Sequence, residues 1–208
     1  MNLMFLIDLL KTANSVEEIE HYREDIVALI PKVRDMFDYD QKHSAHQFDL
    51  WNHSIHTVLN LPRNLDDGML YLAALLHDIG KPESQCKSKR VDDTNMHYYG
   101  HPKKSMEILR DEVIPYLLNS GEKLLSADIK RLLYYVEYHD DRVSEKVKHV
   151  RRHTNMVSFD DFQKLMILQV ADAKAHVMIP VVLERIKVCT ALAGEKGREL
   201  WEEIGDFE

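Results

Sequence analysis

An unbroken apolar run over residues 69–76 constrains the fold most, because it ends directly in His77 and Asp78. A helix that is apolar on every side lies inside a core, and Gly80 and Pro82 are residue types that end a helix. Two ionisable side chains are therefore expected at the inner end of a buried helix. An unpaired carboxylate is costly there unless it takes up a proton. A metal ion beside Asp78 is the simplest partner.

The length of 208 residues suits one domain that buries its core without disulfides. We expect a single domain with a core at about residues 40–180 and helical extensions over 1–39 and 181–208. Glycine and proline are few, with seven and six residues. Leu, Ile, Glu and Lys recur at helical spacing, so the sequence predicts an all-α helical bundle.

The formal net charge of -8 argues against a general nucleic-acid-binding protein, so any phosphate binding must be local. The apolar opening lacks a basic flank and is interrupted by Asp8 and Lys11, which predicts a packed helix rather than a membrane span. The chain contains 12 histidines but only two cysteines, which are far apart in sequence. This favours imidazole and carboxylate as metal ligands and a cytoplasmic location.

Local signals divide the chain into helices. Ser15, followed by Glu18, predicts an N-cap, and Pro31 starts or bends a second helix within residues 1–36. Residues 83–100 predict a surface excursion with a short hairpin, and His101 is the expected N-cap of the helix that Pro102 begins. The further predicted helices are 48–61, 66–77, 102–118, one from Ser126 to about His139, one capped by Ser158 that contains Asp172, and one final amphipathic helix over 181–208.

Six side chains stand out because each lies at a helix end or on an apolar face. They are His53, His77, Asp78, His101, His139 and Asp172. This set of nitrogen and oxygen donors suits Mn, Fe, Co, Ni or Zn, with Mg also allowed, better than copper or calcium. Two ions with Asp78 between them would activate water and neutralise phosphoryl oxygens.

These residues resemble the HD superfamily of metal-dependent phosphohydrolases. The strings at residues 48–54, 72–82, 99–101 and 168–173 are similar to the HD domain attached to bacterial CCA-adding tRNA nucleotidyltransferases. Only about forty residues precede this region, so we expect a free-standing HD phosphohydrolase rather than a CCA-adding enzyme. The resemblance implies that His53, His77, Asp78 and Asp172 bind one metal and that His101 and His139 complete a second, with Asp78 shared.

The expected substrate is a small nucleotide or another phosphate ester, or an RNA end, whose phosphomonoester or phosphodiester is cleaved by a metal-bound hydroxide. Lys81 is a candidate for stabilising the transition state and for binding phosphate. Asp140, or its neighbour Asp141, would orient a ligand or protonate the leaving group. The candidates for contacting substrate are Lys81, His97, Arg151 and Arg152.

Several alternatives stay open at this point. His53 could be a core histidine, His101 an ordinary cap, His139 a charge at a helix end and Lys81 a helix-terminal charge. The remaining histidines, including His46 and His176, are expected to be solvated or structural. The same ligand set would also serve a mixed-valent di-iron oxygenase, and the fold would serve a non-catalytic nucleotide- or RNA-binding module. The oligomeric state is left undetermined.

Overall fold

The computed structural model describes residues 1–63, 65–88 and 92–205. The elements are α1 (Leu3–Thr12), α2 (Val16–Glu20), α3 (Arg23–Leu29), η1 (Pro31–Met36), α4 (Leu50–Leu59), α5 (Gly68–Leu76), α6 (Lys81–Ser84), β1 (Cys86–Lys87), β2 (Met96–His97), α7 (His101–Ile108), η2 (Leu109–Val113), α8 (Ile114–Asn119), α9 (Ser126–Tyr138), α10 (Val147–Thr154), α11 (Phe159–Lys174), α12 (Pro180–Ala193) and α13 (Glu195–Gly205). The predicted all-α class is confirmed.

Helix α5 lies at the centre of the molecule. Its N-cap Asp67 accepts hydrogen bonds from the backbone N–H groups of Met69 and Leu70, which fixes the first turn. Every residue from Met69 to Leu76 is buried, and the helix packs against α1, α4, α9 and α11. Burial stabilises each large apolar side chain by about 1.5–3 kcal/mol. The end of α5 is therefore held firmly within the core.

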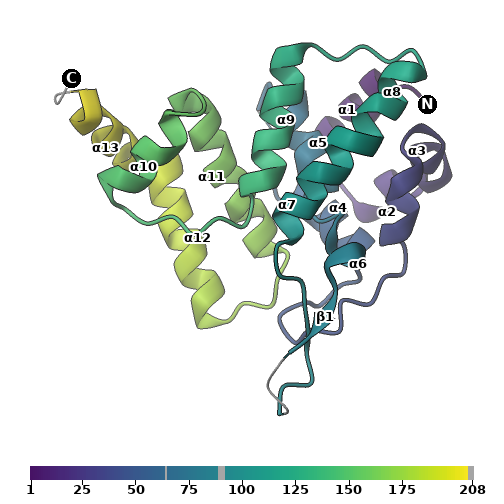
Figure 1. The fold of residues 1–208 in the computed structure, drawn as a ribbon, viewed down its shortest axis with the longest axis horizontal. Helices are drawn as coiled ribbons and strands as arrows, with labels where there is room; N and C mark the ends of the chain where they lie inside the picture. Colours follow the sequence, from purple (N-terminus) through teal and green to yellow (C-terminus); the bar gives the residue numbers. More distant parts are fainter. Residues whose placement is uncertain (64, 89–91, 206–208) are drawn as a thin grey trace.

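Two groups of helices lie on opposite sides of the centre of the molecule. Figure 1 shows α1, α2, α3 and α8 on the side of the N-terminus, and α10, α12 and α13 on the side of the C-terminus. Helix α11 joins the groups, because it packs against α4, α5 and α9 as well as against α12. The predicted hairpin is present as the antiparallel pair β1–β2, with Cys86 opposite His97, and it projects from the bundle.

The segment from α7 to α8 corresponds to the helix predicted over 102–118, with two differences. Gly100, at φ 76°, is the N-cap of α7, so the expectation that His101 occupies this position was wrong by one residue. Glycine adopts this left-handed conformation without steric cost. The π-helical turn η2 precedes Pro115, whose ring would clash with the carbonyl four residues earlier in a regular α-helix.

Both terminal regions contain more elements than predicted. The N-terminal part forms three α-helices and a 3₁₀ helix instead of one or two helices, although the cap at Ser15 is present. The single helix expected over 181–208 is two helices, because Gly194 leaves helical backbone geometry between α12 and α13. Residues 89–91 of the hairpin segment and 206–208 of the C-terminal extension lie outside the described residues.

Within the described residues, no helix combines the length and the apolar character that crossing a bilayer requires.

Candidate metal centre

His77 and Asp78 follow α5 directly and are buried. The neighbouring Gly80 permits close packing, because a Cβ at this position would lie 2.5 Å from the backbone nitrogen of Ser105 in α7. The backbone N–H of Gly80 donates to Oγ of Ser105 at 2.9 Å. This contact fixes the start of α7, which carries His101, against the end of α5.

One oxygen of Asp78 faces a first group of ligand-type atoms. Its Oδ2 lies 3.1 Å from Nε2 of His77 and 3.5 Å from Nε2 of His53. Oδ1 of Asp172, on α11, lies 3.1 Å from Nε2 of His53 and 3.6 Å from Nε2 of His77. Helices α4, α5 and α11 thus place two imidazoles and two carboxylates around one point.

The other oxygen of Asp78 faces a second group. Its Oδ1 lies 3.1 Å from Nε2 of His101, at the start of α7, and 3.4 Å from Nε2 of His139, after α9. The two Nε2 atoms are 3.2 Å apart. The structure therefore brings all six predicted ligands together, with Asp78 between the two groups.

Backbone carbonyls orient three of these imidazoles in the same way. The Nδ1 atom of each ring lies within hydrogen-bond distance of the carbonyl oxygen three residues earlier. The pairs are His77 with Ala74 at 2.9 Å, His101 with Tyr98 at 2.8 Å and His139 with Val136 at 2.7 Å. Donation from Nδ1 leaves the Nε2 lone pair free, which is the usual arrangement of histidines that bind metals.

The electrostatics of the cluster favour a bound cation. Burial raises the pKa of the Asp78 carboxyl, but His77 and Lys81 hold it well below its usual range. Burial also raises the pKa of the Asp172 carboxyl, but His176, His53 and His77 hold it well below its usual range. Burial lowers the pKa of His77, but Asp78 and Asp172 outweigh burial and raise it to about 10. The two ionised carboxylates require positive charge, which a divalent ion would supply in place of the His77 proton.

The residues present fit a transition metal centre. Nε2 of His77 and Oδ1 of Asp78 are buried and make no well-directed hydrogen bond among the described residues, although a carboxylate oxygen and an imidazole nitrogen, respectively, lie 3.1 Å from them. Leaving such atoms unpaired costs about 1–3 kcal/mol each, and metal ligation removes that cost. Imidazole and carboxylate donors suit Mn, Fe, Co, Ni or Zn, while the identity of the metal stays open.

A cavity of about 490 Å³ opens onto this cluster. Asp78, His101, His139 and Asp172 form one part of its wall. Lys81 also lines the cavity, and its Nζ lies 2.7 Å from Oδ2 of Asp78 and donates to the side-chain oxygen of Gln41 at 2.7 Å. A small anionic molecule in this cavity would contact the cluster and Lys81 together.

Of the other predicted site residues, some line the cavity and others lie outside it. His97 and Asp140 line the cavity. Arg151 and Arg152 lie on α10 and are exposed, outside the cavity wall, so the geometry does not support their predicted contact with substrate. Arg152 instead pairs with Asp141, which also accepts from Nε2 of His153 at 3.0 Å.

Sequence reasoning gave no site role to several polar residues of the cavity wall, among them His46, Tyr99, Arg142, His176 and Arg185. Arg185, on α12, donates to the carbonyl oxygen of His139 at 2.6 Å and to Oδ1 of Asp140 at 2.8 Å. Its Nη2 also lies 3.8 Å from Oδ2 of Asp172. No local pattern marks Arg185, because α12 brings it to the site by packing on α11.

Comparison with protein-family models matches residues 45–175 to the family described as HD domain. All six clustered residues lie inside this range. No curated protein sequence matches the chain. HD domains are in general metal-dependent hydrolases, and the buried histidine and aspartate cluster agrees with that chemistry. Because the match covers more than half of the chain, this protein belongs to the HD domain family.

Proposed function

We propose that the protein is a metal-dependent phosphohydrolase that cleaves a phosphomonoester or phosphodiester of a nucleotide-type substrate. The observation that carries the proposal is the position of Asp78, which turns one carboxylate oxygen to His53 and His77 and the other to His101 and His139. When bound at such a site, a pair of divalent ions activates water and neutralises phosphoryl oxygens during displacement at phosphorus.

Three cations of the cavity wall supply the contacts that a phosphate needs. Lys81 is buried beside Asp78, and Arg142 and Arg185 lie on the same wall. Arginine binds phosphate through two parallel hydrogen bonds, and lysine binds it as a point charge. Asp140 accepts from Arg185, so we assign it to orienting this guanidinium rather than to protonating the leaving group.

Replacing Arg185 with glutamine is expected to lower kcat/KM about 10- to 100-fold, because charge-assisted hydrogen bonds contribute about 1.5–3 kcal/mol each. Steady-state kinetics measure this effect. Lys187→Gln is the matched control, since Lys187 is exposed on the same helix and lies outside the cavity wall. Equal kcat/KM values for the Arg185 variant and the unmodified protein would exclude phosphate contact by Arg185.

A stacked aromatic pair at the cavity favours a nucleoside over a simple phosphate ester. The rings of His97 and Tyr99 are parallel within 6°, with centroids 5.2 Å apart. Oδ2 of Asp93 lies 2.7 Å from Nε2 of His97 and holds that ring in place. Tyr99 is 71% exposed although it lines the cavity. An exposed, fixed ring next to a phosphate site is suited to stacking on a nucleobase.

The variant Tyr99→Ala is predicted to raise KM for nucleotides about 5- to 100-fold, since stacking of one base contributes about 1–3 kcal/mol. KM for p-nitrophenyl phosphate, which carries no base, should change little. Tyr116→Ala removes an exposed tyrosine on α8, away from the cavity, and serves as the control. A similar rise in KM for both substrates would argue against a base-stacking role.

The sequence strings noted above, which resemble the HD domain of CCA-adding enzymes, make nucleotides and RNA ends the substrates to test. Metal-stripped protein should be refilled with Mn, Fe, Co, Ni or Zn. Phosphate release, or ring opening for cyclic compounds, is then measured with 2′,3′-cyclic nucleotides, mononucleotides, dinucleoside polyphosphates and an RNA ending in a cyclic phosphate. Metal-dependent turnover of at least one substrate is the expected result, and its absence across the set would count against the proposal.

A further inference from the structure

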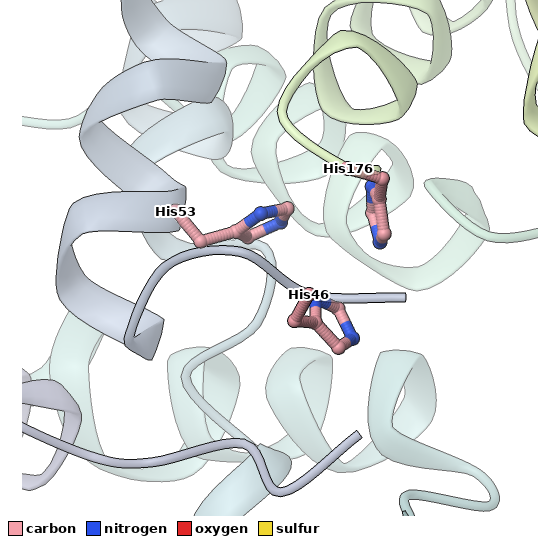
Figure 2. Close-up of side chains that lie close together, drawn as sticks. All are labelled: His46, His53 and His176. Carbon is pink, nitrogen blue, oxygen red and sulfur yellow. The ribbon is translucent and has the colours of Figure 1, made fainter. Parts of the chain in front are cut away.

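Three histidines gather beside the six-residue cluster. His46 precedes α4, His53 lies within α4 and His176 follows α11. Backbone pairing holds the two outer residues together, because His46 and His176 form an antiparallel β-bridge and the N–H of Val177 donates to the carbonyl of Ala45 at 3.0 Å. Figure 2 shows the three rings directed toward a common space.

The geometry of this trio is that of a set of ligands. One ring nitrogen from each histidine lies within 4.8 Å of those from the other two. The ring centroids of His46 and His176 are 4.6 Å apart, and those of His53 and His176 are 4.8 Å apart. His77 and Asp172 form a separate set of three with His53. Nδ1 of His176 lies 3.6 Å from Oδ1 of Asp172, so the two sets adjoin.

The hydrogen bonds of the trio also match those of metal ligands. Nδ1 of His176 lies 2.9 Å from the carbonyl oxygen of Asp172, which leaves Nε2 free, as at His77, His101 and His139. Nδ1 of His46 and Nδ1 of His53 are buried and have no hydrogen-bond partner within the described part of the chain. Two unpaired nitrogens in one small space cost about 1–3 kcal/mol each.

We propose that His46, His53 and His176 form a third metal position next to the two of the proposed function, with which it shares only His53. His53 would bind through Nε2 on the side of the carboxylates and through its unpaired Nδ1 in the trio. The Nδ1 proton is then lost to solvent through the cavity that His46 and His176 line. No carboxylate belongs to the trio, so its donors are nitrogen alone.

Donor type determines which ion the third position selects. Imidazole suits Zn, Ni, Cu and Co, whereas Mn and Mg prefer oxygen donors, and affinity rises from Mn toward Cu across the series. The mixed nitrogen and oxygen groups around Asp78 accept Mn as well as Zn. The third position should therefore fill with Zn²⁺ and stay without an ion in Mn²⁺.

The test is a count of bound metal per chain. The full-length protein is stripped, dialysed against micromolar Zn²⁺ or Mn²⁺ and measured by inductively coupled plasma mass spectrometry. We expect three Zn²⁺ and two Mn²⁺ per chain. His46→Gln and His176→Gln should each lose one Zn²⁺ and keep both Mn²⁺, which also shows that the variants are folded. The control His56→Gln, whose ring stacks on Phe48 outside the trio, should keep three Zn²⁺.

Two Zn²⁺ per chain in the unmodified protein would overturn the third position and leave the proposed function intact. Three Zn²⁺ per chain in both trio variants would also overturn it, because the extra ion would then be bound elsewhere. A crystal soaked in Zn²⁺ adds a direct check by anomalous scattering. A peak between His46 and His176 is expected, and its absence in a crystal with peaks at Asp78 would contradict the proposal.

Discussion

Replacing Asp78 with asparagine is expected to lower metal-dependent phosphate release by about a thousandfold or more. The two oxygens of Asp78 face the two groups of ligand atoms separately, so one substitution weakens both metal positions. Loss of a single preorganised electrostatic contact already costs about 10²- to 10³-fold in kcat. The measurement is kcat at saturating Mn²⁺, with bound metal counted in the same preparation.

Asp141→Asn is the matched control for this variant. Asp141 is a half-buried aspartate close to His139 in the chain, but it pairs with Arg152 and His153 and lies outside the cavity wall. Its replacement should change kcat less than about threefold while costing about 1–3 kcal/mol of stability. An Asp78 variant that retained more than a tenth of the normal kcat would contradict the assignment of Asp78 as the shared ligand.

Removal of metal is expected to lower the melting temperature by about 8–16 °C for each strongly bound ion. A ligand at 1,000 times its Kd stabilises the folded state by about 4 kcal/mol, and 1 kcal/mol shifts Tm by about 2–4 °C at this chain length. The physical reason is that bound metal connects carboxylates and imidazoles that α4, α5, α7, α9 and α11 bring to the cluster. Calorimetry with and without a chelator measures the shift.

The same scan separates metal binding at the cluster from weak binding at the surface. Asp78→Asn should show a much smaller shift on addition of Mn²⁺, while Asp141→Asn should show the full shift. Identical shifts in both variants would mean that stabilisation arises away from the cluster. Unchanged Tm on chelation of the unmodified protein, once metal release is verified, would contradict a metal centre built into the core.

The sequence was sufficient to predict the all-α class and the end of the central helix. A run of eight buried apolar residues, an N-cap and Gly80 are local signals that specify α5 without tertiary information. The helix that begins beside Pro102 and the cap at Ser158 followed from signals of the same kind. The six predicted ligands all belong to the cluster. Each of them lies within such a helix or at its end, where local sequence signals could indicate it.

The residues that sequence reasoning missed depend on packing between distant segments. Arg185 reaches the site only because α12 packs along α11, and no neighbouring residue signals this role. His46 and His176 meet through a single backbone bridge across 130 residues, which periodicity cannot reveal. A basic segment suggested Arg151 and Arg152 for substrate contact, but charge alone does not show whether a helix face is turned to solvent or to a cavity.

The most direct test of metal-dependent phosphate-ester cleavage is a titration of metal-stripped protein with Mn²⁺, in which bound metal and product formation are measured in the same samples. Without metal, we expect no turnover of a nucleotide substrate. Turnover should rise with added Mn²⁺ and reach its maximum when two ions are bound per chain. Full turnover by the stripped protein, or two bound ions with no turnover of any phosphate ester tested, would contradict the proposed metal-dependent phosphohydrolase.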